Sequence, residues 1–469
     1  MARMLDSESL NALAERLSPG AVLTDPDLLE SYRQDWSFDP ESGTPAVVVR
    51  AADTADVQEV LRFAVDHGVP VVPRGAGTSV VGGSTAIDGA ITLSLERMTT
   101  ISVDRESRTA VVEPGAATAD VKGAAADAGL FYPPDPSSFE ICSIGGNVAT
   151  NAGGPCCAKY GVTSDYVLGL TVVLADGSAV ELGGTRVKDS PGLALTKLFV
   201  GSEGTLGVIT SVTLRLVPRP ASPHTLVAYF PHMSDAAAAA QDIAAALSPS
   251  QLEIMDSAAI GLAEDFLRMD LDRTAGALLI ARSDAGLGAP GEIDTMQKAC
   301  KSHGAADVFA TDDEFEGEVF DRPRHAIYEA LEQFGALISD DVAVPLRRLG
   351  ELTDGLAAIA ERHGTTIVSC THAADELTHP VLGYPHGDDA AAVAAAAARS
   401  EIHELVVALG GTVPTEYGIG RHKRAALAAA LSPELLALNR RIKHAVDPTG
   451  ILNPKVLVSA LGETGGRAG

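Results

Sequence analysis

The sequence predicts a mixed α+β protein with two principal domains. Strand and helix patterns alternate through the first half of the chain, a proline-rich stretch interrupts them at residues 218–223, and a second mixed pattern follows. The 469 residues are 46% hydrophobic, which is enough for two or three domains with large cores. With 46 Gly and 26 Pro, the composition is that of a loop-rich globular protein, not of a fibre or a disordered chain.

Hydrophobic patterning justifies the elements of the first half in order. A helical lead-in is expected at residues 1–35. Strands are then predicted at 46–49, 69–73, 90–95 and 109–113, and helices at 54–67 and 118–129. Segment 167–174 ends in A-D-G, which predicts a β-hairpin, and 210–218 is an alternating strand.

The second half begins after P-R-P-A-S-P, residues 218–223, which predicts a domain boundary. Strands are expected at 224–230, 277–282 and 365–369, separated by alanine-rich helices. The tail D-P-T-G-I-L-N-P closes the fold, and no repeat of fixed period occurs.

Charge and composition exclude several classes of protein. The net charge of −27 argues against nucleic-acid binding, because phosphate backbones are bound by clustered Lys and Arg. The first ten residues carry acids where a signal peptide needs an apolar core, and no uncharged apolar run reaches about 18 residues, so no membrane span is expected. The five cysteines are an odd number and two are adjacent, which favours a reduced, cytoplasmic protein.

A glycine loop, P-R-G-A-G-T-S-V-V-G-G at residues 73–83, follows the strand predicted at 69–73. A Rossmann loop would read G-x-G-x-x-G; Gly75 and Gly77 fit, but position 80 is Val and no helix is expected to open there. What remains is a run of backbone N–H groups at 74–79, which can form a nest for anionic oxygens. The alternative is a tight turn that needs positive φ at the two glycines.

Two further stretches accompany this loop. P-P-D-P-S-S-F-E-I-C-S-I-G-G-N-V-A-T-N-A-G-G, residues 133–154, is small and polar and is expected to be extended, so that a large flat ligand can approach its backbone. V-G-S-E-G-T-L-G-V-I-T, residues 200–210, leads into a strand. Each stretch alone is weak, but their order within about 140 residues is specific.

With these motifs the chain resembles the FAD-linked oxidoreductases of the vanillyl-alcohol oxidase / p-cresol methylhydroxylase fold, and within it the D-lactate, glycolate and D-2-hydroxyglutarate dehydrogenase branch. K-Y-G-V-T-S-D-Y-V-L-G-L-T-V-V-L-A-D-G and D-P-T-G-I-L-N-P also match, so the resemblance spans about residues 30–456. It implies a helical lead-in at 1–39, a two-lobed FAD-binding domain at 40–219, an α+β cap (the FAD-linked oxidase C-terminal domain) at 220–440, and a tail at 441–469 that returns to the FAD domain.

The resemblance also implies how FAD is held. Residues 74–79 would bind the pyrophosphate, and the other two stretches would line the adenine, ribitol and isoalloxazine. The implied FAD-binding residues are Arg74, Gly75, Ala76, Gly77, Thr78, Ser79, Pro134, Asp135, Ser138, Ser143, Gly145, Gly146, Asn147, Thr150, Glu203, Gly204, Val208, Ile209 and Asn453. The flavin is expected to be non-covalent, because the loop contains no His and the nearest thiol, Cys142, is interpreted as a small buried residue.

Two histidines, His372 and His379, stand seven residues apart in T-H-A-A-D-E-L-T-H. Nitrogens on one zinc ion lie within about 3–4 Å of each other. Seven residues of helix rise about 10.5 Å, and odd spacing along one strand places side chains on opposite faces. Both histidines therefore reach one ion only if the chain turns between them, and residues 373–378 contain no glycine. Two unrelated histidines in a loop are the alternative.

The resemblance implies that these histidines are metal ligands. The branch carries G-H-x-G-D-G-N-x-H and G-E-H-G-I-G; the matching stretches here are T-H-A-A-D-E-L-T-H and T-E-Y-G-I-G. The implied ligands are His372, His379 and Glu416, a set that suits zinc or manganese. Ala374 and Glu376 replace the two inner glycines, so residues with Cβ atoms must make the turn.

The implied proton acceptor departs from the branch. Oxidation of a 2-hydroxy acid removes the hydroxyl proton as hydride leaves Cα, and the branch uses a His, whose pKa of about 6.5 suits this step. Tyr417 stands at that position with an ordinary pKa of about 10. It is either a base assisted by a metal or cation, or a packing aromatic. His422, in G-R-H-K-R, is the second candidate base, with a solvent-facing position as its alternative.

The resemblance places a substrate-carboxylate contact at Arg324, since a guanidinium can hold a carboxylate through two hydrogen bonds. A surface arginine at the start of a helix is the alternative. Ser339 and Tyr328 replace the lysine and threonine of 2-hydroxyglutarate enzymes, so a second, distal carboxylate would be poorly served.

Three functional hypotheses follow. The first is FAD-dependent hydride transfer from Cα of a D-lactate-like or glycolate-like 2-hydroxy acid to flavin N5, with metal assistance. Its electrons would pass to a separate quinone, cytochrome or flavoprotein, because the chain has no C-x-x-C cluster ligands. The second is same-fold oxidation of a phenolic or other alcohol by use of Tyr417. The third is a non-catalytic, flavin-binding electron-relay subunit. A homodimer is a candidate assembly for each.

Overall fold

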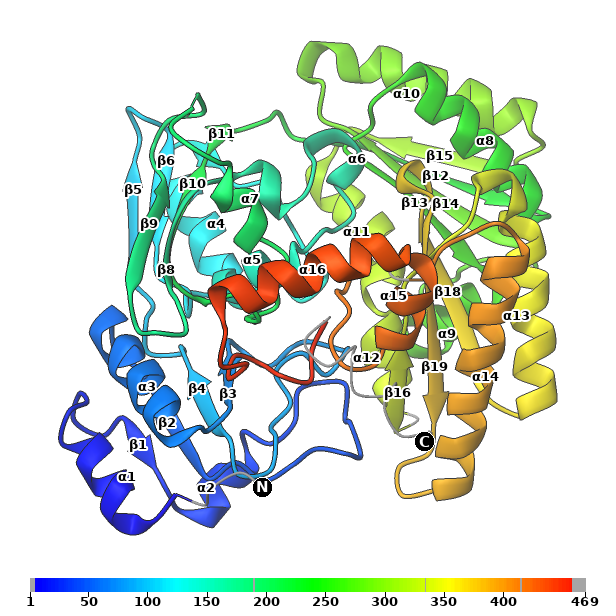
Figure 1. Ribbon diagram of the computed structural model, residues 1–469. Helices are drawn as coiled ribbons and strands as arrows, with labels where there is room; N and C mark the ends of the chain where they lie inside the picture. Colours follow the sequence, from blue (N-terminus) through cyan, green and yellow to red (C-terminus); the bar gives the residue numbers. More distant parts are fainter. Residues whose placement is uncertain (1–4, 189, 334, 414–415, 458–469) are drawn as a thin grey trace. The chain divides into compact units, whose positions relative to one another are not determined.

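The computed structural model describes residues 5–188, 190–333, 335–413 and 416–457. The chain divides into two compact units (Figure 1). Unit 1 comprises Met1–Gly153, Val162–Arg219 and Glu416–Gly469, and unit 2 comprises Gly154–Gly161 and Pro220–Thr415. Within the described ranges, no helix combines the length and apolar character that crossing a membrane requires.

The first sheet of unit 1 carries the glycine loop at the end of one strand. It has the order β1-β2-β4-β3, in which β2 (Val47–Arg50), β4 (Ile91–Ser94) and β3 (Val71–Arg74) are parallel and β1 (Val22–Leu23) is antiparallel to β2. The helix α3 (Thr54–His67) packs its apolar side against this sheet. Because β3 ends at Arg74, the glycine loop begins directly at the sheet edge.

The second sheet of unit 1 is antiparallel and has the order β5-β6-β10-β8-β9. Its strands are β5 (Ile101–Asp104), β6 (Thr109–Val112), β8 (Val167–Val173), β9 (Ala179–Gly183) and β10 (Val208–Arg215). The predicted A-D-G hairpin joins β8 to β9. Tyr132 and Tyr166 meet edge to face beneath this sheet, with ring centroids 6.0 Å apart.

Further helices and two short strands complete unit 1. They are α1 (Ser7–Ala14), α2 (Pro26–Glu30), α4 (Thr118–Asp127), α5 (Ile144–Thr150), α7 (Leu195–Phe199), α15 (Arg424–Ala430), α16 (Pro433–Val446), β7 (Leu130–Phe131) and β11 (Val217–Pro218). The strands predicted in the first half are present as β2, β3, β4 and β6, and both predicted helices are present as α3 and α4.

The expectation that residues 133–154 are extended throughout is wrong. Residues 144–150 form α5, which begins after Ser143 and ends at Asn151 in the left-handed conformation. The Ser143 side chain accepts a hydrogen bond from the Gly146 N–H, as an N-cap residue does. The capping serine therefore overrides the low helix propensity of the two glycines that follow it.

Unit 2 is built on one antiparallel eight-stranded sheet (Figure 1). The order is β15-β12-β14-β13-β18-β19-β16, and β17 also pairs with β19. The strands are β12 (His224–Phe230), β13 (Gln251–Asp256), β14 (Ala277–Ser283), β15 (Asp307–Thr311), β16 (Ala336–Ser339), β17 (Val342–Ala343), β18 (Thr366–His372) and β19 (Leu377–Tyr384). Strands β12, β14 and β18 are those predicted for the second half.

Helices cover both faces of this sheet (Figure 1). One layer contains α8 (Met233–Ala246), α10 (Ala289–Ser302), α13 (Leu349–His363) and α14 (Asp389–Ala408). The other contains α9 (Ser257–Leu267), α11 (Glu314–His325) and α12 (Ile327–Glu332). A short helix, α6 (Cys157–Tyr160), joins unit 2 from the segment 154–161, where Lys159 and Tyr160 both bond to the Asp284 carboxylate.

Candidate functional site

The glycine loop of unit 1 presents backbone donors. In the described part of the chain, the N–H groups of Gly77, Thr78 and Ser79 bond to no protein acceptor, whereas the Ala76 N–H donates to Ser143 Oγ at 3.3 Å. Gly77 has φ +77°, which favours glycine. Three consecutive unsatisfied N–H groups fit the oxygen atoms of a phosphate.

Arg74 adds a positive charge beside the same loop. Its side chain is buried, its guanidinium lies 5.9 Å from the Tyr32 ring centroid, and its Nη1 makes no hydrogen bond among the described residues. A buried guanidinium nitrogen without an acceptor is costly unless a ligand supplies one. Backbone donors and this cation together fit the pyrophosphate of FAD.

The remaining predicted cofactor residues all lie in unit 1, and backbone contacts bring their three stretches together. The second stretch surrounds α5: Pro134, Asp135 and Ser138 precede this helix, Ser143 caps it, and it contains Gly145, Gly146, Asn147 and Thr150. The third stretch surrounds the start of β10: Glu203 and Gly204 form the turn before this strand, which begins with Val208 and Ile209. Asn453 lies in the tail. Ser143 Oγ links the glycine loop to α5, and the Glu203 N–H donates to the Ala149 carbonyl at 2.8 Å.

Two of these residues hold other parts of unit 1 with their side chains. The Glu203 carboxylate accepts the N–H groups of Ile419 and Gly420 at 2.8 and 2.7 Å. Burial raises the pKa of Glu203 to about 7, against the opposing effect of those two N–H groups. Asn453 Nδ2 donates to the carbonyls of Gly83 and Glu203, both at 2.9 Å. Both side chains thus organise the loop that follows Tyr417.

The two histidines of unit 2 are neighbours across a hairpin, not unrelated residues of a loop. β18 ends at His372, a single 3₁₀ turn follows, and β19 pairs His379 with Cys370. The imidazole centroids lie 4.9 Å apart, and their ring nitrogens lie within 4.8 Å of each other. Glu376 makes the turn in the left-handed conformation, with φ +57°. One nitrogen of each ring can therefore point toward a common ion without a change in the hairpin.

Hydrogen bonds orient both imidazoles. His372 Nδ1 lies 2.5 Å from Glu253 Oε1, and His379 Nδ1 lies 3.3 Å from the Asp340 carbonyl oxygen. Both partners are acceptors when Glu253 is ionised, so the proton lies on Nδ1 and the lone pair on Nε2 in each ring. Metal-binding histidines are commonly held in this way. The donor set therefore fits a divalent ion.

Arg324 is a buried residue in the last turn of α11, not a surface arginine at a helix start. Its Nε donates to Glu253 Oε2 at 2.8 Å. Burial opposes its charge, but Cys370 and Glu253 act in the other direction, and the net pKa of Arg324 is raised. The guanidinium is therefore a permanent buried cation.

The other predicted catalytic residues lie in unit 1. The ammonium of Lys423 lies 5.5 Å from the centroid of the Tyr417 ring. His422 is mostly buried and lies 3.6 Å from the Asp39 carboxylate, so the expected solvent-facing position is wrong. Glu416 is the first residue of the last segment of unit 1. Thr412, four residues earlier, bridges Ala343 of β17 in unit 2.

Glu253 is the functional candidate that the sequence did not indicate. It lies in L-E-I-M-D, where an acid in an apolar strand carries no motif of its own. Its partners are 71 and 119 residues away. Glu253 is fully buried in a central strand, and its role can be recognised only from its contacts with Arg324 and His372, which the folded structure brings together.

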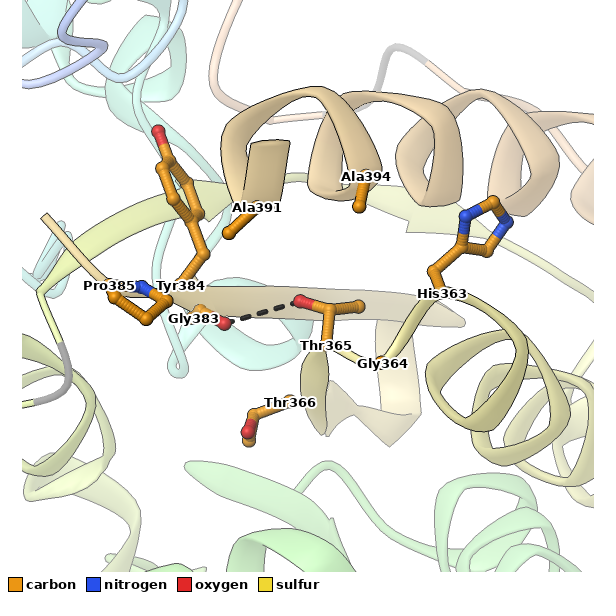
Figure 2. Close-up of a pocket in the computed structure, with 9 residues that line it drawn as sticks. All are labelled: His363, Gly364, Thr365, Thr366, Gly383, Tyr384, Pro385, Ala391 and Ala394. Atoms are coloured by element: carbon orange, nitrogen blue, oxygen red, sulfur yellow. Dashed lines mark hydrogen bonds between the residues drawn. The ribbon is translucent and has the colours of Figure 1, made fainter. Parts of the chain in front are cut away.

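A separate hollow of unit 2 contains none of the predicted site residues (Figure 2). It lies at the opposite end of the β18–β19 hairpin, where the Thr365 hydroxyl donates to the Gly383 carbonyl. It is lined by His363, Gly364, Thr365, Thr366, Gly383, Tyr384, Pro385, Ala391 and Ala394.

Similar solved structures define the class of fold. p-Cresol methylhydroxylase with bound substrate matches with a TM-score of 0.80 over 96% of each chain, at 16% identity. 4-Ethylphenol oxidase from Gulosibacter chungangensis matches with a TM-score of 0.77 over 96% of this chain and 97% of that chain, at 18% identity. The protein therefore has the α+β fold of p-cresol methylhydroxylase.

Similar sequences define the family. Residues 45–183 match the FAD binding domain, and residues 219–457 match the C-terminal domain of FAD linked oxidases. The glycolate oxidase subunit GlcD of Bacillus subtilis is 36% identical over 87% of this chain and 88% of its own. D-lactate dehydrogenase of Archaeoglobus fulgidus is 34% identical over 92% and 96%, and mitochondrial D-2-hydroxyglutarate dehydrogenase of Bos taurus is 31% identical over 96% and 83%. The chain belongs to the FAD-linked oxidase family and is an FAD-dependent oxidoreductase.

Proposed function

We propose that the protein oxidises a 2-hydroxy acid at its hydroxyl-bearing carbon. The observation that carries this proposal is the buried cluster at one end of the unit 2 sheet, where Arg324, Glu253 and His372 form a continuous hydrogen-bonded chain. A permanent cation suits a substrate carboxylate, and two imidazoles suit a divalent ion that binds the adjacent hydroxyl. The names of the relatives, glycolate oxidase and D-lactate dehydrogenase, support the same class of substrate.

The metal part of the proposal uses His372, His379 and Glu416, with zinc or manganese as the ion. Glu416 is included because it stands where the branch has its glutamate ligand, in T-E-Y-G-I-G. When bound, the ion would make the substrate hydroxyl more acidic.

FAD, when bound, would supply the hydride acceptor, and the chain itself must accept the hydroxyl proton. Tyr417 stands where the branch has its base, and the Lys423 ammonium lies over its ring. This contact puts a cation beside the aromatic ring, and a tyrosine base would need a cation or metal as a neighbour. His422 is the second candidate, although its ring faces Asp39.

The substrate side chain is proposed to be short and uncharged. Tyr328 and Ser339 replace the threonine and lysine of 2-hydroxyglutarate enzymes, and their hydroxyl oxygens lie 3.2 Å from each other. Neither side chain supplies a cation for a second carboxylate. D-lactate and glycolate are therefore better candidates than D-2-hydroxyglutarate.

The partners are proposed on chemical grounds. Electrons would leave the flavin for a separate quinone, cytochrome or flavoprotein, since the chain has no cluster-binding cysteine motif. A cytoplasmic homodimer is the proposed assembly and location.

An anaerobic substrate panel tests the proposal. The purified protein is mixed with D-lactate, L-lactate, glycolate, D-2-hydroxyglutarate and a phenolic alcohol, and the flavin absorbance band is followed. Bleaching by D-lactate or glycolate supports the proposal, and metal analysis of the same sample should find about one divalent ion per chain. Bleaching by the phenolic alcohol alone would favour the alternative based on Tyr417. No bleaching by any member would favour an electron-relay subunit.

A further inference from the structure

We propose that Glu253 is a positioning residue that fixes, with one carboxylate, both the substrate-binding guanidinium and one metal-binding imidazole. The inference rests on the proposed function, and it adds a residue that links the proposed substrate-carboxylate contact to the proposed metal site. Oε2 accepts from Arg324 Nε at 2.8 Å, and Oε1 lies 2.5 Å from His372 Nδ1. All three side chains are buried, and Glu253 is fully so.

The sheet fixes Glu253 more firmly than a loop could. It lies within β13, between β14 and β18, and it pairs with Ile280 on one side and with His372 on the other. Cross-strand partners project from the same face of a sheet, so the carboxylate and the imidazole meet without a bend in either strand. Oε1 is thereby used within the sheet, and Oε2 is left for Arg324 of the covering helix α11.

The arrangement has a defined chemical effect on the imidazole. An ionised carboxylate only accepts hydrogen bonds, so it holds the His372 proton on Nδ1 and the lone pair on Nε2. Such a carboxylate also makes the imidazole a better metal ligand, and its loss commonly weakens metal binding by about 10–100-fold. His379 is oriented by the Asp340 carbonyl, which side-chain substitution does not remove.

The effect on the guanidinium is one of orientation. With Nε engaged by Glu253, a bidentate contact to a substrate carboxylate would use the edge formed by Nη1 and Nη2. Arg324 would otherwise have several rotamers. Glu253 therefore sets the direction in which the cation faces, and it offsets the positive charge that burial makes costly.

The test compares Glu253→Gln with Glu253→Asp. Glutamine has one acceptor oxygen for two donors, so one of the two contacts must be lost, whereas aspartate keeps the charge and both oxygens on a shorter stem. Metal-stripped protein is titrated with Zn²⁺ alone. We expect Zn²⁺ affinity to fall by about 10–100-fold in Glu253→Gln and by less in Glu253→Asp, with normal flavin content in both.

Kinetics with D-lactate give a second, independent measure. In Glu253→Gln the KM should rise by about 10-fold or more, because the misplaced guanidinium weakens substrate binding. In an Arg324→Lys background the same substitution should change KM much less, because contacting residues give non-additive effects. A purely structural role would lower the melting temperature without this non-additivity.

Asp256→Asn is the matched control. Asp256 is a buried acid of the same strand, but its carboxylate bonds to Ser369 and caps α9. This variant should lose stability while it keeps wild-type Zn²⁺ affinity and KM. If the wild-type protein binds Zn²⁺ and is reduced by D-lactate, and Glu253→Gln has the same Zn²⁺ affinity and KM, only the positioning role of Glu253 would be overturned. A wild-type protein that binds no Zn²⁺ and is not reduced by any hydroxy acid would instead overturn the proposed function and this inference with it.

Discussion

At the scale of single residues, Tyr417 is the position where this chain departs most from its branch. If its phenol accepts the hydroxyl proton, Tyr417→Phe should lower the rate of flavin reduction by about 10²–10⁴-fold, the usual contribution of a general base. Tyr417→His should restore the base of the branch and reduce flavin with D-lactate faster than wild type. Anaerobic stopped-flow absorbance measures both rates.

The controls for Tyr417 separate packing from proton transfer. His422→Gln should have a smaller effect than Tyr417→Phe, because its imidazole is engaged with Asp39. If Tyr417→Phe were as active as wild type and His422→Gln were inactive, the base would be His422. If no hydroxy acid reduced the flavin of Tyr417→His, and Tyr417→Phe was inactive as well, the substrate would be a different alcohol.

The glycine loop allows a second test at a single residue. Gly77→Val places a β-branched side chain at φ +77° and a Cβ atom 2.2 Å from the Arg74 guanidinium, so the nest should be lost. We expect purified apoprotein, measured as the ratio of flavin absorbance to protein. Gly89→Val is the control, because it has a similar φ of +71° but open space around its Cβ position. Equal flavin content in the two variants would contradict the assignment of this loop to the pyrophosphate.

Some of these residues could be predicted from the sequence and others could not. Gly75 and Gly77 stand in a local motif, and the spacing of His372 and His379 predicted that the chain must turn between them. Glu253 has no local pattern, because its role depends on two contacts made across the tertiary structure. The contact between His422 and Asp39 could not be predicted either, because it joins residues far apart in the sequence.

At the scale of elements, the β18–β19 hairpin makes its tight turn without glycine. Glu376 has φ +57°, a conformation that costs a residue with a Cβ atom about 1 kcal/mol. Its Oε1 also accepts the Leu346 N–H at 3.0 Å. Glu376→Ala and Glu376→Gly both lose this bond, so they differ in backbone strain and in the freedom of the unfolded chain, and we expect the strain to be the larger effect at this positive φ. The glycine variant should melt about 2–4 °C above the alanine variant, as thermal circular dichroism can show.

Ala374→Gly is the control for the hairpin. Position 374 is the other glycine of the branch pattern, but it does not have a positive φ here. Glycine should therefore give no stabilisation at 374, since it only adds freedom to the unfolded chain. A higher melting temperature for Ala374→Gly than for wild type would contradict this account of the turn.

The element that the sequence misjudged is α5. Its residues I-G-G-N-V-A-T are small and include two glycines, so propensity argues against a helix. Ser143 at the N-cap and Asn151 in the left-handed C-cap conformation were the available indications. Elements with strong periodicity, such as α3 and β12, were predictable because local pattern and tertiary burial agree there.

At the scale of the whole molecule, distant parts of the chain complete unit 1. Val71 of β3 bridges Leu452 of the tail, and Arg421 donates to the carbonyls of Thr85 and Ala86. Asp39 joins the N-terminal segment to the same late region, at 3.5 Å from Arg421 and 3.6 Å from His422. The family resemblance implied that the tail returns to the FAD-binding domain. No local sequence pattern could predict this return, because the paired residues are hundreds of positions apart in the chain.

The Asp39 contacts make a prediction about acid stability. The nearby imidazole of His422 lowers the pKa of Asp39 to about 2, with help from the Glu41 N–H and Arg421. Because the folded pKa lies below the unfolded value of about 3.9, the carboxylate stabilises the fold above about pH 4, and this contribution disappears as pH falls toward 2. Asp39→Asn should therefore melt below wild type at pH 5, and the difference should shrink as the pH falls and vanish near pH 2. Trp36, the single tryptophan, reports the local change by fluorescence, and far-UV circular dichroism reports the whole molecule.

Asp66→Asn, at an exposed acid of α3, is the control and should melt like wild type at every pH. A difference for Asp39→Asn that stayed constant down to pH 2 would show that packing, not the charge of Asp39, joins the two ends of the chain.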